Sequence, residues 1–229
     1  MPEPLSAAGL APFIQHTLIE TGATRQRMIR HARECVEYGF DAAMVPGSWV
    51  ALVAAELRGT GIGIASAIDF PTVGVMTSAG KAAEAVELVR LGATQIDIGV
   101  QVGWLKSGMT EEFQEDIAGV VRASGVPIKV MLELPLLTMD ERELAVSLAV
   151  AAGASYLKNA SSGAIETANP ESIAWLVARA PTGVLVKASG SIKSAGQAIS
   201  LIEAGASLLG TSAGIEIVTG AASEMMRAY

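Results

Sequence analysis

The sequence predicts a (β/α)8 TIM barrel, formed as a single domain by residues 1–229, on three observations. First, a segment containing Gly-Ala recurs at residues 91–99, 152–160 and 204–212, with a looser copy at 38–46. Each copy of this Gly-Ala phrase, as we call the repeated motif, joins a helical stretch to a β-type run. Second, eight β-type runs alternate with eight helical stretches. Third, the 229 residues show no composition break, which indicates one domain, and their number is close to the roughly 250 residues usual for such a barrel. A doubly wound open sheet is the rival fold, and the even run of eight units without a second subdomain favours the barrel.

The elements follow one another in a regular order. The short β-type runs predict strands at residues 13–18, 42–45, 63–68, 95–100, 128–134, 155–159, 184–188 and 207–210. The segments between them have helical periodicity and predict helices at residues 24–39, 48–59, 78–92, 111–125, 139–153, 170–180 and 194–205, with an eighth after the GTSAG sequence at 210–214. Glycine closes most of these helices, because a left-handed C-cap lets the next strand follow directly.

The composition excludes several classes of function. Hydrophobic residues make up 51% of the chain and charged residues 17%, so we expect a large buried core. A net charge of -7 argues against a nucleic-acid partner and against anionic membranes. No run approaches the roughly 18 apolar residues of a membrane span, and the N-terminal residues lack the basic-then-apolar order of a signal peptide. A small-molecule substrate and a cytoplasmic location are therefore expected.

Cysteine and histidine are scarce. The single cysteine, Cys35, excludes an intrachain disulfide and fits a reducing compartment. The two histidines, His16 and His31, would both have to converge to build a zinc site of the His/Cys type. The sequence therefore predicts no metal and no cofactor.

Two lysines occupy unusual places for charged residues. Lys158 and Lys187 come late in two neighbouring predicted strands, and the carboxyl ends of barrel strands carry the active site. Strand alternation, with apolar residues toward the helices, turns both lysines into the barrel together with Tyr156, Leu185 and Asp97. Two buried cations side by side disfavour each other's charge, so one of them should be substantially neutral near pH 7, as a nucleophilic amine must be.

A structural reading competes with the catalytic one. Buried lysine–aspartate pairs also occur as plain salt bridges, and the sequence offers a further pair of that kind in Lys129 and Glu133. Lys129 lies at the start of its strand, away from the catalytic end, so a structural role is expected for it. The pattern alone leaves both readings open for Lys158 and Lys187.

Five stretches together resemble the deoxyribose-phosphate aldolase family: FIQHTLI, LGATQIDIGVQVGWLKSG, KVMLELPLLT, YLKNAS and VKASGSIKSAGQAISLIEAGASLLGTSAG. The resemblance runs in order from about residue 13 to 218 and implies a metal-independent class I aldolase on a TIM barrel. It implies that Lys158 forms the Schiff base, that Lys187 lowers the pKa of Lys158, and that Asp97 takes part in proton transfer. Thr17 matches a threonine near the catalytic water of the family.

The resemblance also implies a phosphate-binding end. The residues at the corresponding loops are Ser161, Gly190, Ser191, Gly210 and Ser212. Backbone amides at two helix starts there could hold an anion.

The sequence departs from the family pattern at this end and elsewhere. Ser191 replaces a glycine in SGSI, Ala213 replaces a serine in GTSAG, and Ser162 replaces a glycine in KNASS. Gln15 removes a carboxylate from the usual DHT sequence, and Asp69 adds one near the barrel mouth, where it would oppose a phosphate if it pointed inward.

The function implied is the reversible cleavage of 2-deoxy-D-ribose 5-phosphate into D-glyceraldehyde 3-phosphate and acetaldehyde. The departures motivate one alternative, a related Schiff-base aldolase acting on a non-phosphorylated or differently substituted aldehyde acceptor. A non-catalytic barrel with salt-bridged lysines is the third reading. The apolar composition is compatible with a homodimer.

Overall fold

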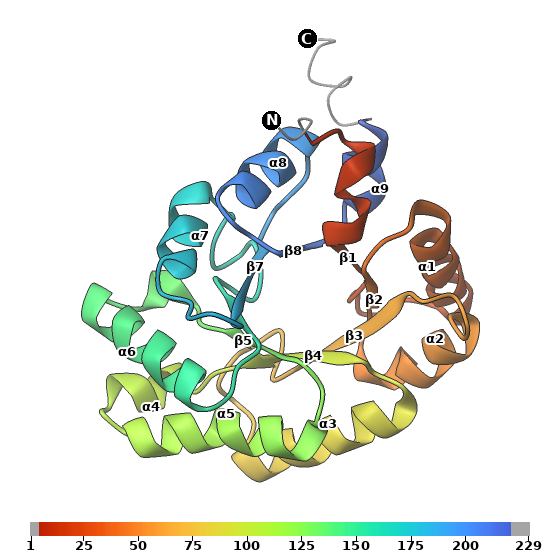
Figure 1. Cartoon of the computed structure of the whole chain (residues 1–229). Coiled ribbons are helices and arrows are strands. Elements are labelled where there is room, and N and C mark those ends of the chain that lie inside the picture. Colours follow the sequence, from red (N-terminus) through yellow and green to blue (C-terminus); the bar gives the residue numbers. More distant parts are fainter. Residues whose placement is uncertain (1–4, 221–229) are drawn as a thin grey trace.

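A closed barrel of eight parallel strands forms the centre of the protein (Figure 1). The structure, a computed structural model, describes residues 5–220. The strands pair in chain order and close through β1 and β8, as the predicted barrel requires. Their bounds are β1 Ile14–Thr17, β2 Ala42–Met44, β3 Gly63–Ile68, β4 Gln95–Gly99, β5 Ile128–Met131, β6 Tyr156–Lys158, β7 Leu185–Ser189 and β8 Leu208–Thr211.

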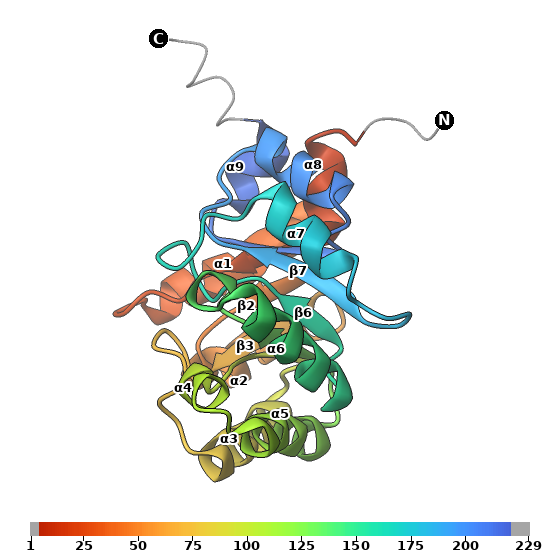
Figure 2. The ribbon, with the colours of Figure 1, turned by 90° about the vertical axis from the view of Figure 1, so that its left-hand side faces the viewer.

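Helices surround the barrel on its outside, and Figure 2 shows α6 and α7 side-on against it. Their bounds are α1 Arg25–Tyr38, α2 Val50–Glu56, α3 Ser78–Leu91, α4 Val102–Lys106, α5 Thr110–Ser124, α6 Met139–Ala151, α7 Pro170–Val177, α8 Ala195–Glu203 and α9 Gly214–Thr219. Three 3-10 helices accompany them: η1 Ala8–Phe13, η2 Gly47–Trp49 and η3 Leu134–Leu136. No helix of residues 5–220 combines the length and the apolar character needed to cross a bilayer.

The helix ends follow from local sequence. Side-chain oxygens accept backbone N–H groups at the starts of five helices, from Thr24, Thr77, Thr138, Asn169 and Ser194. The glycine of each copy of the repeated phrase has a positive φ: Gly39, Gly92, Gly153 and Gly205. The expected turn from helix to strand is therefore confirmed.

Three details differ from the sequence prediction. Helix α4 occupies the segment after β4, for which no helix was predicted. Strand β5 ends at Met131 rather than at residue 134, because Glu133 has a left-handed backbone with φ of 54° and Leu134 begins η3. Leu185, expected inside, is 43% exposed because it is the first residue of β7, at the barrel end away from the catalytic residues.

The apolar core and the barrel interior have different compositions. The main hydrophobic cluster includes the helix-facing strand residues Ile96, Ile98, Leu157 and Val186. A second, small apolar cluster around Met44 lies on β2 and β3. Polar and charged side chains fill much of the remaining interior, and five of them are fully or almost fully buried: Gln15, Asp97, Lys129, Lys158 and Lys187.

Candidate active site

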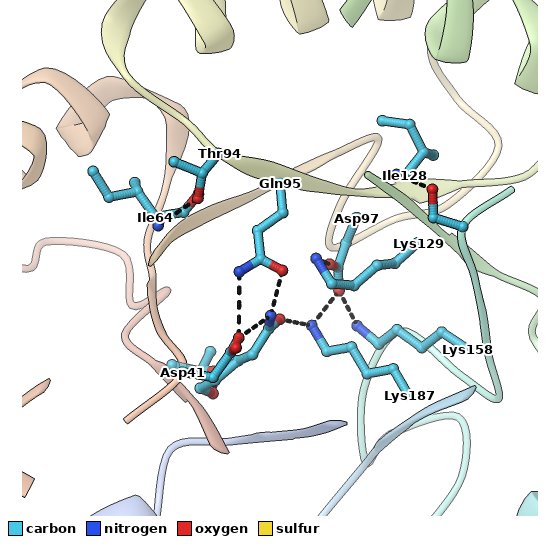
Figure 3. Close-up of polar contacts among 12 residues, drawn as sticks. Asp41, Ile64, Thr94, Gln95, Asp97, Ile128, Lys129, Lys158 and Lys187 are labelled. Carbon is cyan, nitrogen blue, oxygen red and sulfur yellow. Dashed lines mark hydrogen bonds and ion pairs between the residues drawn. The ribbon is translucent and has the colours of Figure 1, made fainter. Parts of the chain in front are cut away.

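Inside the barrel, three lysine side chains surround the carboxylate of Asp97 (Figure 3). Asp97 Oδ2 accepts hydrogen bonds from Lys158 Nζ at 2.9 Å and from Lys187 Nζ at 2.7 Å. Its other oxygen lies 3.5 Å from Lys129 Nζ. Strand register brings this about, because Asp97 pairs with Lys129 across β4 and β5, and Lys158 pairs with Lys187 across β6 and β7. The constellation expected from the sequence is thus assembled, with Lys129 as an additional member.

The charges in this cluster depend on one another. Burial alone would raise the pKa of Asp97, but the positive charges of Lys158, Lys187 and Lys129 hold it well below its ordinary value. Burial lowers the pKa of Lys187 to about 7, with Asp97 opposing that shift and the other two lysines adding to it. Burial likewise lowers the pKa of Lys129. The three lysines therefore favour the ionised form of Asp97, whereas burial disfavours the ammonium form of Lys187.

The predicted pairing of Lys129 with Glu133 is wrong. Lys129 lies near Asp97 and also 5.6 Å from the centroid of the Tyr156 ring. The left-handed backbone at Glu133 turns that residue away, and its carboxylate accepts the Ser161 amide at 3.0 Å. Burial raises the pKa of Glu133.

A cavity of about 300 Å³ opens above the lysines at the carboxyl ends of the strands. Both Lys158 and Lys187 line it, whereas Asp97 lies fully buried beneath them. All of the residues expected to bind substrate also line it: Thr17, Ser161, Gly190, Ser191, Gly210 and Ser212. Glu20, Phe70 and Lys193 line the cavity as well, and the sequence reasoning did not single them out. A buried amine beside a cavity of this size can form a covalent bond with a small carbonyl compound.

Relatives share this sequence along nearly its whole length. A deoxyribose-phosphate aldolase from Brevibacillus brevis is 40% identical over 210 residues, which cover 91% of this chain and 95% of that protein. A deoxyribose-phosphate aldolase from Methanothermobacter thermautotrophicus is 39% identical over 212 residues, which cover 92% and 94%. The chain belongs to the deoxyribose-phosphate aldolase family. No family model matches the chain.

Solved structures agree with this assignment. The aldolase QR15 has a TM-score of 0.87 at 28% identity, covering 96% of this chain and 99% of its own. A deoxyribose phosphate aldolase from Aeropyrum pernix, described as having a unique tetrameric structure, has a TM-score of 0.86 at 29% identity, covering 96% and 93%. The protein is therefore an aldolase on a TIM barrel.

In this aldolase Asp69 does not oppose an anion in the cavity, contrary to the concern raised by its position. Its carboxylate accepts the backbone amides of residues 74, 75 and 76 and lies 3.0 Å from Lys81 Nζ. Lys81 in turn donates to Asp116 at 2.8 Å, and all three side chains are fully buried. Burial alone would raise the pKa of Asp69, but Lys81 and the loop amides lower it. Asp69 therefore organises the loop after β3.

The loops at the predicted phosphate end are partly committed to internal contacts. The Ser161 amide is used by Glu133, and the Ala213 amide donates to Thr211 Oγ1 at 2.9 Å. Ser191, in the glycine position of the family, has a left-handed backbone with φ of 50°, and its side chain packs against Gly163. An anion here would depend on the remaining amides and hydroxyls and on Lys193.

A network that the sequence did not reveal fixes the loop after β6. Asn159 is fully buried, accepts the Ser189 amide at 2.9 Å and donates to Glu166 at 2.7 Å. Glu166 also accepts from Asn169 and Ser172 at the start of α7. This network ties the residue after Lys158 to β7 and α7, so the backbone that carries the lysine is anchored.

The two histidines do converge, although the sequence gave no reason to expect it. The rings of His16 and His31 stack at 4.5 Å, near Glu34, and burial lowers their pKa values to about 4 and about 3. One candidate ligand atom from each of His16, His31 and Glu34 lies within 4.8 Å of the others. The two stacked rings are buried and pack within the core beside Phe40.

Proposed function

We propose that this aldolase cleaves 2-deoxy-D-ribose 5-phosphate reversibly into D-glyceraldehyde 3-phosphate and acetaldehyde, through a Schiff base on Lys158. The observation that carries the proposal is the position of Lys158 Nζ beside the cavity and 2.9 Å from the Asp97 carboxylate. Lys158 Nζ has one hydrogen-bond partner among the described side chains, whereas Lys187 Nζ has two. Lys158 is thus the less restrained of the two amines.

The proposed reaction begins when the neutral amine of Lys158 adds to the substrate aldehyde, and loss of water gives an iminium ion. Removal of the proton from the hydroxyl on carbon 3 then breaks the bond between carbons 2 and 3. The bonding electrons pass into the iminium and form an enamine, so no metal is needed as an electron sink. Protonation and hydrolysis of the enamine release acetaldehyde and restore the amine.

The pKa values of Lys187 and Asp97 suit them to different roles in the reaction. A group with a pKa near the working pH is the most effective proton carrier, and Lys187 meets that condition at about 7. Asp97 is a poor proton acceptor because its pKa is held well below the ordinary range. We therefore give Lys187 the larger part in proton transfer and give Asp97 the task of orienting both lysines.

Reductive trapping tests this proposal. Incubation with acetaldehyde and borohydride should attach an ethyl group to the chain, and peptide mass spectrometry should place it on Lys158. Lys158→Met should abolish the adduct and the activity, whereas Lys187→Met should slow adduct formation without moving it. An adduct on Lys187, or none on the wild-type chain, would overturn the proposal.

The same preparation tests the acceptor. The names of the relatives do not favour the non-phosphorylated alternative, and Asp69, one reason for considering it, faces its own loop. We propose that a phosphate is held near Ser191, Ser212 and Lys193 at the cavity mouth. Turnover of the phosphorylated sugar should then exceed that of 2-deoxyribose by orders of magnitude. Equal turnover would restore the alternative.

We further propose that the protein is cytoplasmic and acts as a homo-oligomer. The homodimer expected from composition is one candidate, and the Aeropyrum pernix relative is described as a tetramer. Light scattering coupled to size-exclusion chromatography distinguishes the two states.

A further inference from the structure

Gln15 is a buried neutral side chain in direct contact with the lysine cluster. It lies on β1 with no exposed surface, and its Oε1 accepts a hydrogen bond from Lys187 Nζ at 2.6 Å. Lys187 therefore lies between two acceptors, the carboxylate of Asp97 and the amide of Gln15. Nothing in the aldolase mechanism described above uses Gln15.

The orientation of the Gln15 amide is determined by its other neighbours. Its Nε2 donates to Asp41 Oδ2 at 2.8 Å and to Gln95 Oε1 at 2.6 Å. Gln95 Nε2 donates to the same Asp41 oxygen at 3.3 Å, which fixes the Gln95 amide as well (Figure 3). A flipped Gln15 would place its oxygen against a carboxylate and its NH2 against the lysine. Its oxygen must therefore face Lys187.

The charged groups around Lys187 come from several strands. Asp97 on β4 attracts the ammonium form, while Lys158 on β6 and Lys129 on β5 disfavour it. Asp41, before β2, lies behind the Gln15 amide and has no direct bond to Lys187. The adjacent β8 presents Gly210, which carries no charge. On the β1 side, Gln15 thus supplies hydrogen bonding without a second negative charge.

We propose that Gln15 is a positioning residue that, held by Asp41 and Gln95, directs an uncharged acceptor at Lys187 and so sets the pH range in which the aldolase works. An amide oxygen holds the amine in place in either protonation state, because a neutral amine can still donate an N–H. A carboxylate at this position would instead favour the ammonium form strongly. This inference rests on the proposed function of Lys158 and Lys187.

The test compares two variants of equal length that differ in charge, Gln15→Asp and Gln15→Asn. Both side chains are one methylene shorter than glutamine, so the longer distance to Lys187 affects the two variants equally. The measurement is the inflection near neutral pH in the profile of kcat/KM for 2-deoxyribose 5-phosphate. In Gln15→Asp that inflection should lie about 1 to 3 pH units higher than in Gln15→Asn, as expected for an opposite charge near an amine.

A matched control is Gln101→Asn, which shortens another buried glutamine, bonded to the Met76 carbonyl away from the lysines. Its inflection should coincide with that of the wild type. Equal inflections in the Asp and Asn variants would overturn the proposal and leave Gln15 a packing residue. Borohydride trapping on the wild type separates this result from failure of the proposed function, because loss of the Lys158 adduct there would refute the Schiff base itself.

Discussion

Replacing Asp97 by asparagine should remove one charge and almost no volume from the centre of the barrel. Three lysine nitrogens lie 2.7, 2.9 and 3.5 Å from its carboxylate, and none of the four side chains exposes more than a few per cent of its surface. At an effective dielectric constant of about 20, one unit-charge pair at roughly 3 Å interacts by about 5.5 kcal/mol. Asp97→Asn therefore removes the principal attraction that offsets lysine burial.

Proton release limits the cost of the substitution. Deprotonating a lysine of ordinary pKa at pH 7 costs about 4.6 kcal/mol. Each lysine left without its counter-ion can therefore lower the free energy of unfolding by no more than this amount, because it can release its proton instead. The pKa of Lys187 is already about 7, so most of that cost is present in the wild type. In the variant, at least one of the other two lysines must then also lose its proton. We expect the free energy of unfolding at pH 7 to fall by about 3 to 5 kcal/mol.

The loss should depend on pH with a definite sign. Near pH 7 the unfolded variant binds more protons than the folded one, because its lysines regain ordinary pKa values on unfolding. Stability therefore rises with pH, by about 1.4 kcal/mol per unit for each proton of difference. The deficit relative to the wild type should shrink between pH 7 and pH 9.5, measured by urea unfolding with circular dichroism.

A deficit below about 1 kcal/mol at pH 7, or one that is the same at both pH values, would refute this reasoning. The matched control is Glu115→Gln, which removes an exposed carboxylate paired with Arg122. Its urea midpoint should stay at the wild-type value at every pH.

Three further predictions concern residues outside the lysine cluster. Lys81→Met leaves two buried carboxylates without their cation, so it should lower the free energy of unfolding by about 3 to 5 kcal/mol in urea titrations; a near-neutral effect would contradict the buried ion pairs. Thr138→Ala removes half of the capping box with Glu141 and should cost about 1 kcal/mol by the same measurement, while an unchanged midpoint would show that the cap contributes nothing. Cys35 is buried and burial raises its pKa to about 12, so a thiol reagent should label it only after denaturation; rapid labelling of the native protein would refute this.

The fold was largely predictable because its determinants are local and repeated. Each copy of the Gly-Ala phrase ends a helix with a left-handed glycine, as at Gly92 and Gly153, and the strands that follow alternate as expected around Asp97 and Lys158. Strand ends were less predictable. The end of β5 depends on the left-handed backbone at Glu133, a residue type that rarely adopts it.

The site was predictable in membership but less so in its contacts. The strand alternation places Lys158, Lys187 and Asp97 on the inner side, yet it does not say which partner an inward side chain reaches across the barrel. The sequence therefore pairs Lys129 with the nearby Glu133, because distances across the barrel cannot be read from residue spacing, whereas the structure places Lys129 beside Asp97. The sequence distinguishes Gln15 only by the charge that it lacks, because its contact with Lys187 joins residues 172 positions apart.

The polar lining of this barrel bears on how the protein can be made more heat-resistant. Most TIM barrels fill the same space with layers of branched aliphatic side chains, and cores of that kind tolerate exchange for other apolar side chains of similar volume. Here that space is occupied by the reacting groups and their counter-ions, so enlarging an aliphatic side chain there would displace catalytic machinery. Stabilising substitutions should instead be sought in the shell where the strands pack on the helices, around residues such as Ile98 and Leu157.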